Sequence, residues 1–270
     1  VNTKRAAREL FEALKSGGTD GVFHLSTAMC PQHRRGILKQ VRMLLHDKVQ
    51  TLLVSTQLIE AGVDVDFPFL MRELAPLESI IQAAGRCNRE GRMAEGTVQV
   101  FRSQAAHDEP KKYYPPDRWY KAGRALIEEH LRLKGDGPQP DDPAAIREYY
   151  TRLFNSGMPL DEHGVQALRL KFSFATVAES YRLIDNASEP VVVRWESERA
   201  TVEALLTEVA KRPGKELFRR LARYQVNFFS HQFVKLSHLM HEQVGGIRVW
   251  DGRYDETVGV VEEMEGEFVV

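Results

Sequence analysis

Apolar residues in the first hundred positions either recur at helical spacing or form short runs. Two segments, residues 4–16 and 37–45, place apolar side chains on one helical face. Two others, residues 22–25 and 51–54, have the length of strands. The run at 51–54 is almost entirely apolar, which suits a parallel strand that is covered on both faces.

The same alternation continues over the rest of the first hundred residues. A short helix is predicted from about Gln57 to Gly62, because glycine commonly ends helices. Further strands are predicted at residues 67–71 and 97–101, with a helix at 77–87 between them. Strands that alternate with helices predict a doubly wound α/β domain with a parallel sheet. Ligands of such sheets bind at the carboxyl ends of the strands.

The pattern changes after residue 106. Proline and glycine residues there separate two predicted helices, at residues 117–134 and 143–154. A mixed α/β region follows, with strands predicted near 191–193, 225–229, 246–250 and 257–261 and helices at 198–211 and 214–222. The expected organisation is an α/β domain at 1–106, a linker with accessory helices at 107–174 and a smaller mixed α/β domain at 175–270.

Composition narrows the functional classes. Of the 270 residues, 43% are hydrophobic and 28% are charged, as in soluble globular proteins. A formal net charge of −1 means that any contact with nucleic acid must come from a local groove. Cys30 and Cys87 form no C-x-x-C pair, so we predict neither a zinc site nor a disulfide framework and expect a reducing cytoplasm. No apolar run reaches the roughly 18 residues of a membrane helix.

The pattern Q-x-x-G-R-x-x-R at residues 82–89 carries the strongest chemical signal. On a helix, Gln82, Arg86 and Arg89 would share one face, and Gly85 would let another surface approach. Two guanidinium groups on one face can grip a γ-phosphate and stabilise the charge that builds as it leaves. The alternative is an amphipathic surface helix whose arginines meet solvent or nearby carboxylates.

The segment at residues 54–66 adds a second signal directly after the predicted buried strand. Thr56 and Gln57 would lie at the carboxyl end of that strand, where a hydroxyl group and helix N-terminal amides can hold a phosphate. Gly62 allows a tight turn. Asp64 could accept a hydrogen bond from a ribose or orient an arginine. Without the second motif, the segment would be an ordinary strand, helix and turn with a capping aspartate.

Together, the two segments S-T-Q-L-I-E-A-G-V-D-V-D-F-P and Q-A-A-G-R-C-N-R-E-G resemble motifs V and VI of superfamily 2 helicases. The amino-acid sequences of these two segments are most similar to those of the helicase–nuclease of type I CRISPR interference. Residues 24–34 resemble the segment that these proteins carry before motif V, and residues 2–6 resemble the end of their motif IV strand. The resemblance covers residues 1–101.

This resemblance implies that residues 1–106 are the second RecA-like domain of a helicase. Gln82, Arg86 and Arg89 would face ATP in the cleft between two RecA-like domains, with Gly62 and Asp64 beside the nucleotide. The sugar-phosphate backbone of single-stranded DNA would be contacted by a second set of residues, namely Thr3, Ser26, Thr27, Thr56 and the adjoining Gln57. The family moves 3′ to 5′ along DNA delivered by a Cascade-type CRISPR surveillance complex, and a separate His-Asp metal domain cuts that strand.

Other parts of such a helicase are not found in the sequence. The chain has no G-x-x-x-x-G-K-[ST] phosphate loop and no D-E-x-H box after an apolar strand. We therefore expect the first RecA-like domain, which would hold Mg²⁺, and the nuclease domain to lie outside this segment. The domain at 1–106 is expected to be truncated at its N-terminal strand, and the segment alone is expected not to hydrolyse ATP.

Weaker features favour structural explanations. His238 and His241 would share a helical face, but a surface pair is favoured over a metal site. The basic and aromatic residues of 211–229 could bind a single strand, although a solvated helix face is favoured. Two alternative functions remain: another superfamily 2 helicase, of repair or restriction, or a non-enzymatic module that binds DNA or a partner through its arginine face.

Overall fold

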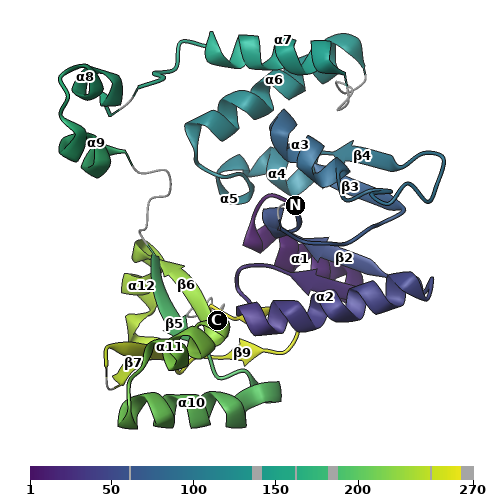
Figure 1. The fold of residues 1–270 in the computed structure, drawn as a ribbon. Helices are drawn as coiled ribbons and strands as arrows, with labels where there is room; N and C mark the ends of the chain where they lie inside the picture. The colour runs from purple at the N-terminus through teal and green to yellow at the C-terminus, as the bar shows by residue number, and fades with distance from the viewer. Residues whose placement is uncertain (61, 136–141, 162, 182–187, 244, 263–270) are drawn as a thin grey trace, which may run out of the picture.

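The structure is a computed structural model that describes residues 1–60, 62–135, 142–161, 163–181, 188–243 and 245–262. Figure 1 shows that the chain forms an N-terminal α/β part, a set of helices and a C-terminal α/β part. No helix of the described residues is long and apolar enough to cross a membrane.

The N-terminal part contains two pairs of parallel strands, which agrees with the predicted α/β class. Strand β1 pairs with β2, and β3 pairs with β4. The elements of this part are α1 (Lys4–Ser16), β1 (Val22–Leu25), α2 (Pro31–His46), β2 (Leu52–Ser55), η1 (Gln57–Ile59), β3 (Phe69–Glu73), α3 (Leu77–Ala84) and β4 (Thr97–Phe101). The strands predicted from the apolar runs are therefore present, each followed by helical residues.

The first two residues lie between the two strand pairs, at their carboxyl ends. The amino group of Val1 donates to the Ser55 carbonyl oxygen at the end of β2, 2.9 Å away. The backbone N–H of Asn2 donates to the Glu73 carboxylate at the end of β3, at 2.8 Å. Helix α1 then begins at Lys4, with the Thr3 hydroxyl accepting from the N–H of Ala6. The chain thus enters α1 at the edge where ligands of parallel sheets bind.

A helical region follows, and its two long helices occur where the sequence predicted them. The elements are α4 (Gln104–Asp108), α5 (Pro110–Tyr113), α6 (Arg118–Lys134), α7 (Pro143–Phe154), α8 (Val165–Leu170) and α9 (Phe174–Ser180). Helix α6 ends at Gly135, whose φ of 80° lies in the left-handed region that glycine adopts readily. Ile127 and Leu153 of α6 and α7 join Leu77 of α3 in one apolar cluster. The helices α8 and α9 were not predicted.

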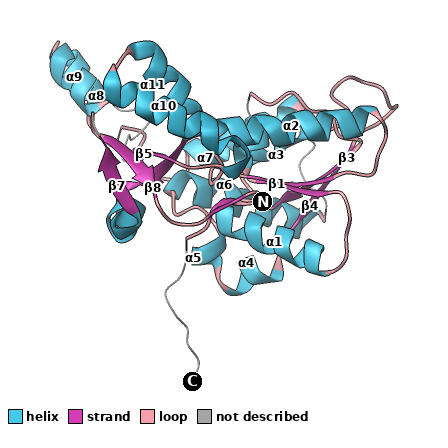
Figure 2. Ribbon diagram, turned by 90° about the horizontal axis from the view of Figure 1, so that it is seen from below, coloured by secondary structure: helices cyan, strands magenta, loops and turns pink. Residues whose placement is uncertain are grey.

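The C-terminal part is a mixed four-stranded sheet with the order β6-β5-β8-β7. Its main elements are β5 (Ser188–Val192), η2 (Glu196–Glu198), α10 (Arg199–Lys211), α11 (Lys215–Leu221), η3 (Ala222–Tyr224), β6 (Gln225–Phe229), α12 (Ser230–Leu236), η4 (Ser237–Leu239), β7 (Met240–Gln243) and β8 (Ile247–Trp250). Two short strands, β9 (Tyr254–Asp255) and β10 (Gly259–Val260), follow. In Figure 2, α10 and α11 lie along one face of this sheet.

Most predicted elements of the C-terminal part are present, but one prediction is wrong. The strands expected near 191–193, 225–229 and 246–250 correspond to β5, β6 and β8. His238 and His241 do not share a helical face, because His238 lies in η4 and His241 lies in β7. The chain extends there and pairs antiparallel with β8, with His241 opposite Val249.

The basic residues of α11 form a solvated helix face, as favoured from the sequence. Leu221 is fully buried, while Arg219 is exposed and pairs with Glu216 on the same helix. Two aromatic residues of the segment, Tyr224 and Phe228, belong to the apolar core, whereas Phe218 and Phe229 are exposed.

Candidate functional site

Arg86 binds the segment that the sequence identified upstream of it. Its Nε donates to the Ile59 carbonyl oxygen at 3.0 Å, and its Nη2 donates to the Glu60 carbonyl oxygen at 2.8 Å. The guanidinium group is half-buried and has no carboxylate within ion-pair distance among the described residues. The two segments predicted to act together are therefore in direct contact.

The helical face predicted for the two arginines is wrong. Helix α3 ends at Ala84, so Arg86 and Arg89 lie in the loop that follows it. The helix ends because the backbone of Arg86 and Asn88 forms hydrogen bonds with Phe67 instead. The N–H of Phe67 donates to the Arg86 carbonyl oxygen, and the N–H of Asn88 donates to the Phe67 carbonyl oxygen, both at 2.9 Å. Asn88 also has a positive φ of 47°, which no helix accommodates. A loop, not a helix, brings the arginines to one side.

Arg89 faces the same upstream segment through weaker contacts. Its Nη1 lies 3.4 Å from an Asp64 carboxylate oxygen and 3.4 Å from the Val63 carbonyl oxygen. The side chain of Arg89 is 43% exposed and that of Asp64 is 83% exposed. The backbone N–H of Arg89 donates to Asp66 at 2.7 Å, which fixes the loop itself. Of the two roles considered for Asp64, the contact in the structure is the one with an arginine.

Gln82 and Gly62 lie at the two edges of this arrangement. Gln82 is exposed on the last turns of α3. Gly62 has a φ of 69°, and a Cβ added to it would meet no atom within 4 Å. Its backbone conformation, rather than a close approach, therefore favours glycine, in agreement with the predicted tight turn.

A buried ionic network lies beneath the loops, and the sequence analysis did not identify it. Arg72 on β3 is 3% exposed, and its Nη2 lies 2.9 Å from the Glu60 carboxylate. Its Nη1 donates to the Asn2 side chain at 2.7 Å. Burial raises the pKa of Glu60, and the charge of Arg72 opposes that shift. Adjacent charges inside a strand, Arg72 and Glu73, were the signal that could have found this network.

The residues predicted to contact DNA lie at the carboxyl ends of β1 and β2 or beside α1, and they differ in exposure. Ser26 is fully buried and accepts from the Ala28 N–H, while Thr27 beside it is exposed. Thr56 is 8% exposed, and its N–H donates to Leu25. Thr27 is therefore the predicted residue of these loops that is open to a ligand.

The helix predicted after Thr56 is also shorter than expected. Gln57 begins η1, a three-residue 3-10 turn, so the argument from helix N-terminal amides is wrong at this position. Gln57 is half-buried. Thr3 is half-buried too, and its hydroxyl caps α1.

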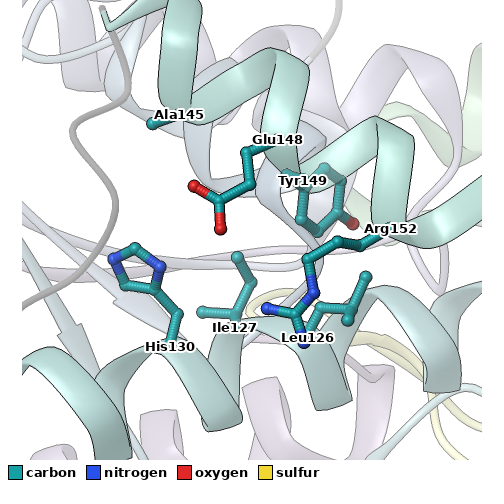
Figure 3. Close-up of a pocket in the computed structure, with 7 residues that line it drawn as sticks. All are labelled: Leu126, Ile127, His130, Ala145, Glu148, Tyr149 and Arg152. Carbon is teal, nitrogen blue, oxygen red and sulfur yellow. The ribbon is translucent and has the colours of Figure 1, made fainter.

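No metal site accompanies this arrangement in the described ranges, where no group of three or more His, Cys, Asp or Glu side chains could hold an ion. A small pocket lies between α6 and α7, where His130, Glu148 and Arg152 line it (Figure 3). Its volume of about 20 Å³ admits roughly one water molecule, so it is too small for a nucleotide.

Known proteins resemble this chain in sequence over the residues that form this arrangement. Residues 1–92 match the family model described as CRISPR-associated nuclease/helicase Cas3, C-terminal. Over these residues the chain is similar to the C-terminal part of that family. This match confirms the resemblance found in the two motif segments. The CRISPR-associated nuclease/helicase Cas3 of Haloferax volcanii is 40% identical over 157 residues, which cover 50% of this chain and 16% of that protein. The chain thus spans a small share of that relative.

Solved structures extend the likeness in fold beyond the matched residues. The match to a crystal structure of T. fusca Cas3-ATP covers 97% of this chain and 38% of the T. fusca chain, with a TM-score of 0.63 and 14% identity. A second match is to a chain in a structure named CRISPR RNA-guided surveillance complex, pre-nicking. It covers 96% of this chain and 40% of that chain, with a TM-score of 0.61 and 15% identity. At such identities the similarity shows the fold, and it includes the C-terminal part.

Proposed function

We propose that this chain forms the second RecA-like half and the C-terminal region of an ATP-dependent translocase on single-stranded DNA, acting in type I CRISPR interference. The observation that carries the proposal is the convergence of Arg86 and Arg89 on the segment around residues 59–64. Two cations from one loop thereby meet a second loop that leaves the carboxyl end of β2. Within this proposal, residues 1–106 form the motor domain, 107–174 the linker and 175–270 the accessory domain.

The two guanidinium groups suit the terminal phosphate of ATP. Arg86 uses two of its N–H groups on backbone carbonyl oxygens, which holds the group in place and leaves other N–H groups to donate. Arg89 is more exposed, and Asp64 orients it. Fixed positive charge at this position stabilises negative charge that develops on a leaving phosphoryl group. Gln82 and Gly62 would border the nucleotide.

The remaining parts of the ATP site would come from outside this chain. In the proposed motor, the first RecA-like domain supplies the phosphate cradle and holds Mg²⁺, which neutralises charge on the β- and γ-phosphate oxygens. The described residues contribute the arginines and Asp64. Consequently, the segment alone should show no ATP turnover, and measurable hydrolysis by the purified segment would contradict this assignment.

Single-stranded DNA would pass the carboxyl ends of β1 and β2. Thr27 is exposed there, and Thr3 lies at the start of α1 beside the same edge. Hydroxyl groups and backbone amides are common partners of phosphate oxygens. The partner that delivers the DNA would be a Cascade-type surveillance complex, which the structural neighbour in such a complex supports.

Alanine substitutions in a full-length protein that carries this segment test the proposal. Arg86→Ala and Arg89→Ala should each lower ATP turnover by about a thousandfold, the effect of arginines in comparable nucleotide hydrolases, and leave single-strand binding nearly unchanged. Arg92→Ala is the matched control, because Arg92 is an exposed arginine on the same loop that pairs with Glu90. Loss of DNA or partner binding with intact ATP turnover would instead favour the docking module.

A further inference from the structure

The loop between β1 and α2 contains Thr27 and is shaped by its own hydrogen bonds. The Ser26 hydroxyl accepts from the Ala28 N–H at 3.2 Å, and the Ser26 carbonyl oxygen accepts from the Met29 N–H at 3.2 Å. Both Ser26 and Met29 are buried, so they hold the loop from inside. Thr27 is the exposed residue at its tip. The position of Thr27 therefore also depends on the residues that contact the outer side of this loop.

A segment of the C-terminal part fixes that outer side. We define the strap as residues 254–261, which follow the four-stranded sheet and lie against the N-terminal part. The N–H of Val260 donates to the Ala28 carbonyl oxygen at 2.8 Å. Val258 is buried in the cluster that also contains Val22 and Val54 of β1 and β2. The strap is thus part of the packing of both α/β parts.

Gly259 allows the strap to approach this closely. Its φ of 83° favours glycine, and a Cβ at this position would lie 2.3 Å from the Ala28 carbonyl oxygen. The obstructing atoms belong to the backbone of Ala28 and Met29, so they cannot turn aside as a side chain could. Any larger residue at 259 must displace the loop that bears Thr27.

Tyr254 holds the other end of the loop. Its hydroxyl oxygen accepts from the Cys30 N–H at 3.1 Å and lies 2.9 Å from His33 Nδ1. Cys30 is the N-cap of α2 and makes no side-chain capping bond, so Tyr254 satisfies a group at the helix start that would otherwise be buried alone. His33 in turn stacks on Trp195, with ring centroids 4.8 Å apart.

We propose that Gly259 and Tyr254 are positioning residues that hold Thr27 for the sugar-phosphate backbone of single-stranded DNA. This inference rests on the proposed function and gives the C-terminal part a role in it. Two points that closely follow Thr27, at Ala28 and Cys30, are fixed by residues more than two hundred positions later in the chain. The strap sets the shape of the loop, and Thr27 makes the contact.

The test is DNA-stimulated ATP turnover in a full-length protein that carries this segment. Gly259→Ala should raise the KM for single-stranded DNA by roughly tenfold, because a small misplacement of a contacting group is costly. Tyr254→Phe should raise it by about fivefold, because it removes the hydroxyl that accepts from the Cys30 N–H and keeps the ring. In both variants kcat at saturating DNA should stay within about twofold. A general loss of folding would lower kcat and the amount of active protein instead.

A double variant separates positioning from independent effects. Because Gly259 acts through Thr27, the variant Thr27→Ala/Gly259→Ala should have the KM of the worse single variant rather than the product of both effects. Gly246→Ala is the matched control: Gly246 has a φ of 75°, but a Cβ there meets no atom within 4 Å. Its KM for DNA should be unchanged.

The outcomes distinguish this inference from the function on which it rests. If Thr27→Ala raises the KM and neither Gly259→Ala nor Tyr254→Phe does, the positioning role is wrong and the DNA contact stands. Multiplicative effects in the double variant also overturn the positioning role. If Thr27→Ala itself leaves the KM unchanged, the proposed DNA contact at this loop fails.

Discussion

The two α/β parts of the chain differ in whether they bury charged side chains beside their apolar clusters. In the N-terminal part, Arg72, Glu60 and Glu73 are buried together beneath the loops that carry the candidate site. In the C-terminal part, the interior is a continuous apolar cluster that includes Val249 and Trp250, and ion pairs such as Arg248–Glu189 lie near the surface.

This difference in buried charge matches the role proposed for each part. Polar groups in a buried network fix the backbone at defined angles, because each donor requires its partner. The loops after β2 and β3 need such fixing, since they contain or support the arginine contacts. An apolar interior gives stability without aiming any side chain at a ligand, which suits a part that supports the site from outside through the strap.

The largest expected effect comes from breaking the buried ion pair. Arg72→Met should lower the free energy of unfolding by about 3–5 kcal/mol, because it leaves the Glu60 carboxylate buried without its partner. Urea denaturation followed by circular dichroism measures this. The double variant Arg72→Met/Glu60→Met should recover part of the loss, since no unpaired charge remains. A single variant as stable as the parent would show that the network is not a structural element.

A cavity in the C-terminal core should have the next largest effect. Leu221 is fully buried, so Leu221→Ala should lower the free energy of unfolding by about 3 kcal/mol through lost packing. Leu170→Ala is the control, because Leu170 on α8 is 76% exposed and should change little. Equal effects of the two substitutions would contradict the apolar account of this part.

The stability of the chain should depend on pH through His24, which lies where β1 meets the strap. Burial lowers the pKa of His24 from 6.5 to about 4. The unfolded chain therefore binds this proton at a higher pH than the folded chain, and the free energy of unfolding decreases as pH falls below 6.5 towards 4. The loss from His24 should be about 2 kcal/mol by about pH 5.

Thermal unfolding across this pH range provides the measurement. His24→Leu should show a smaller dependence on pH than the parent. The dependence should not vanish, because burial also lowers the pKa of His33. A His24→Leu variant with the full pH dependence of the parent would exclude His24 as its source.

The smallest effect on stability is expected from the exposed ion pair between Arg89 and Asp64. Asp64→Asn should change the free energy of unfolding by less than about 0.5 kcal/mol, because both side chains are solvated. It should nevertheless lower ATP turnover of the full-length protein, since it removes the group that orients Arg89. Glu90→Gln, on the loop that carries Arg89, serves as the control and should alter neither property. A large loss of stability in Asp64→Asn would mean that the pair is structural.

The sequence was informative where periodicity and motifs act locally. The strands at 22–25, 51–54 and 97–101 were predicted closely, because short runs rich in apolar residues are a local signal. The expected cover on both faces of the strand at 51–54 is wrong, since Leu52 is 42% exposed. The end of α3 was not predicted, because it depends on Phe67, which competes for the backbone of Arg86 and Asn88 from a distant position. The buried network and the strap were missed for the same reason: each joins residues that are far apart in sequence.

Replacing one arginine by lysine tests the central claim most directly. Lysine keeps the charge of Arg86 but lacks the forked donors that bind two carbonyl oxygens and a phosphate together. In a full-length protein that carries this segment, Arg86→Lys should lower kcat for ATP at saturating DNA by at least about a hundredfold, while the Kd for single-stranded DNA stays the same. An unchanged kcat, or a loss confined to DNA binding, would contradict the assignment of Arg86 to the terminal phosphate.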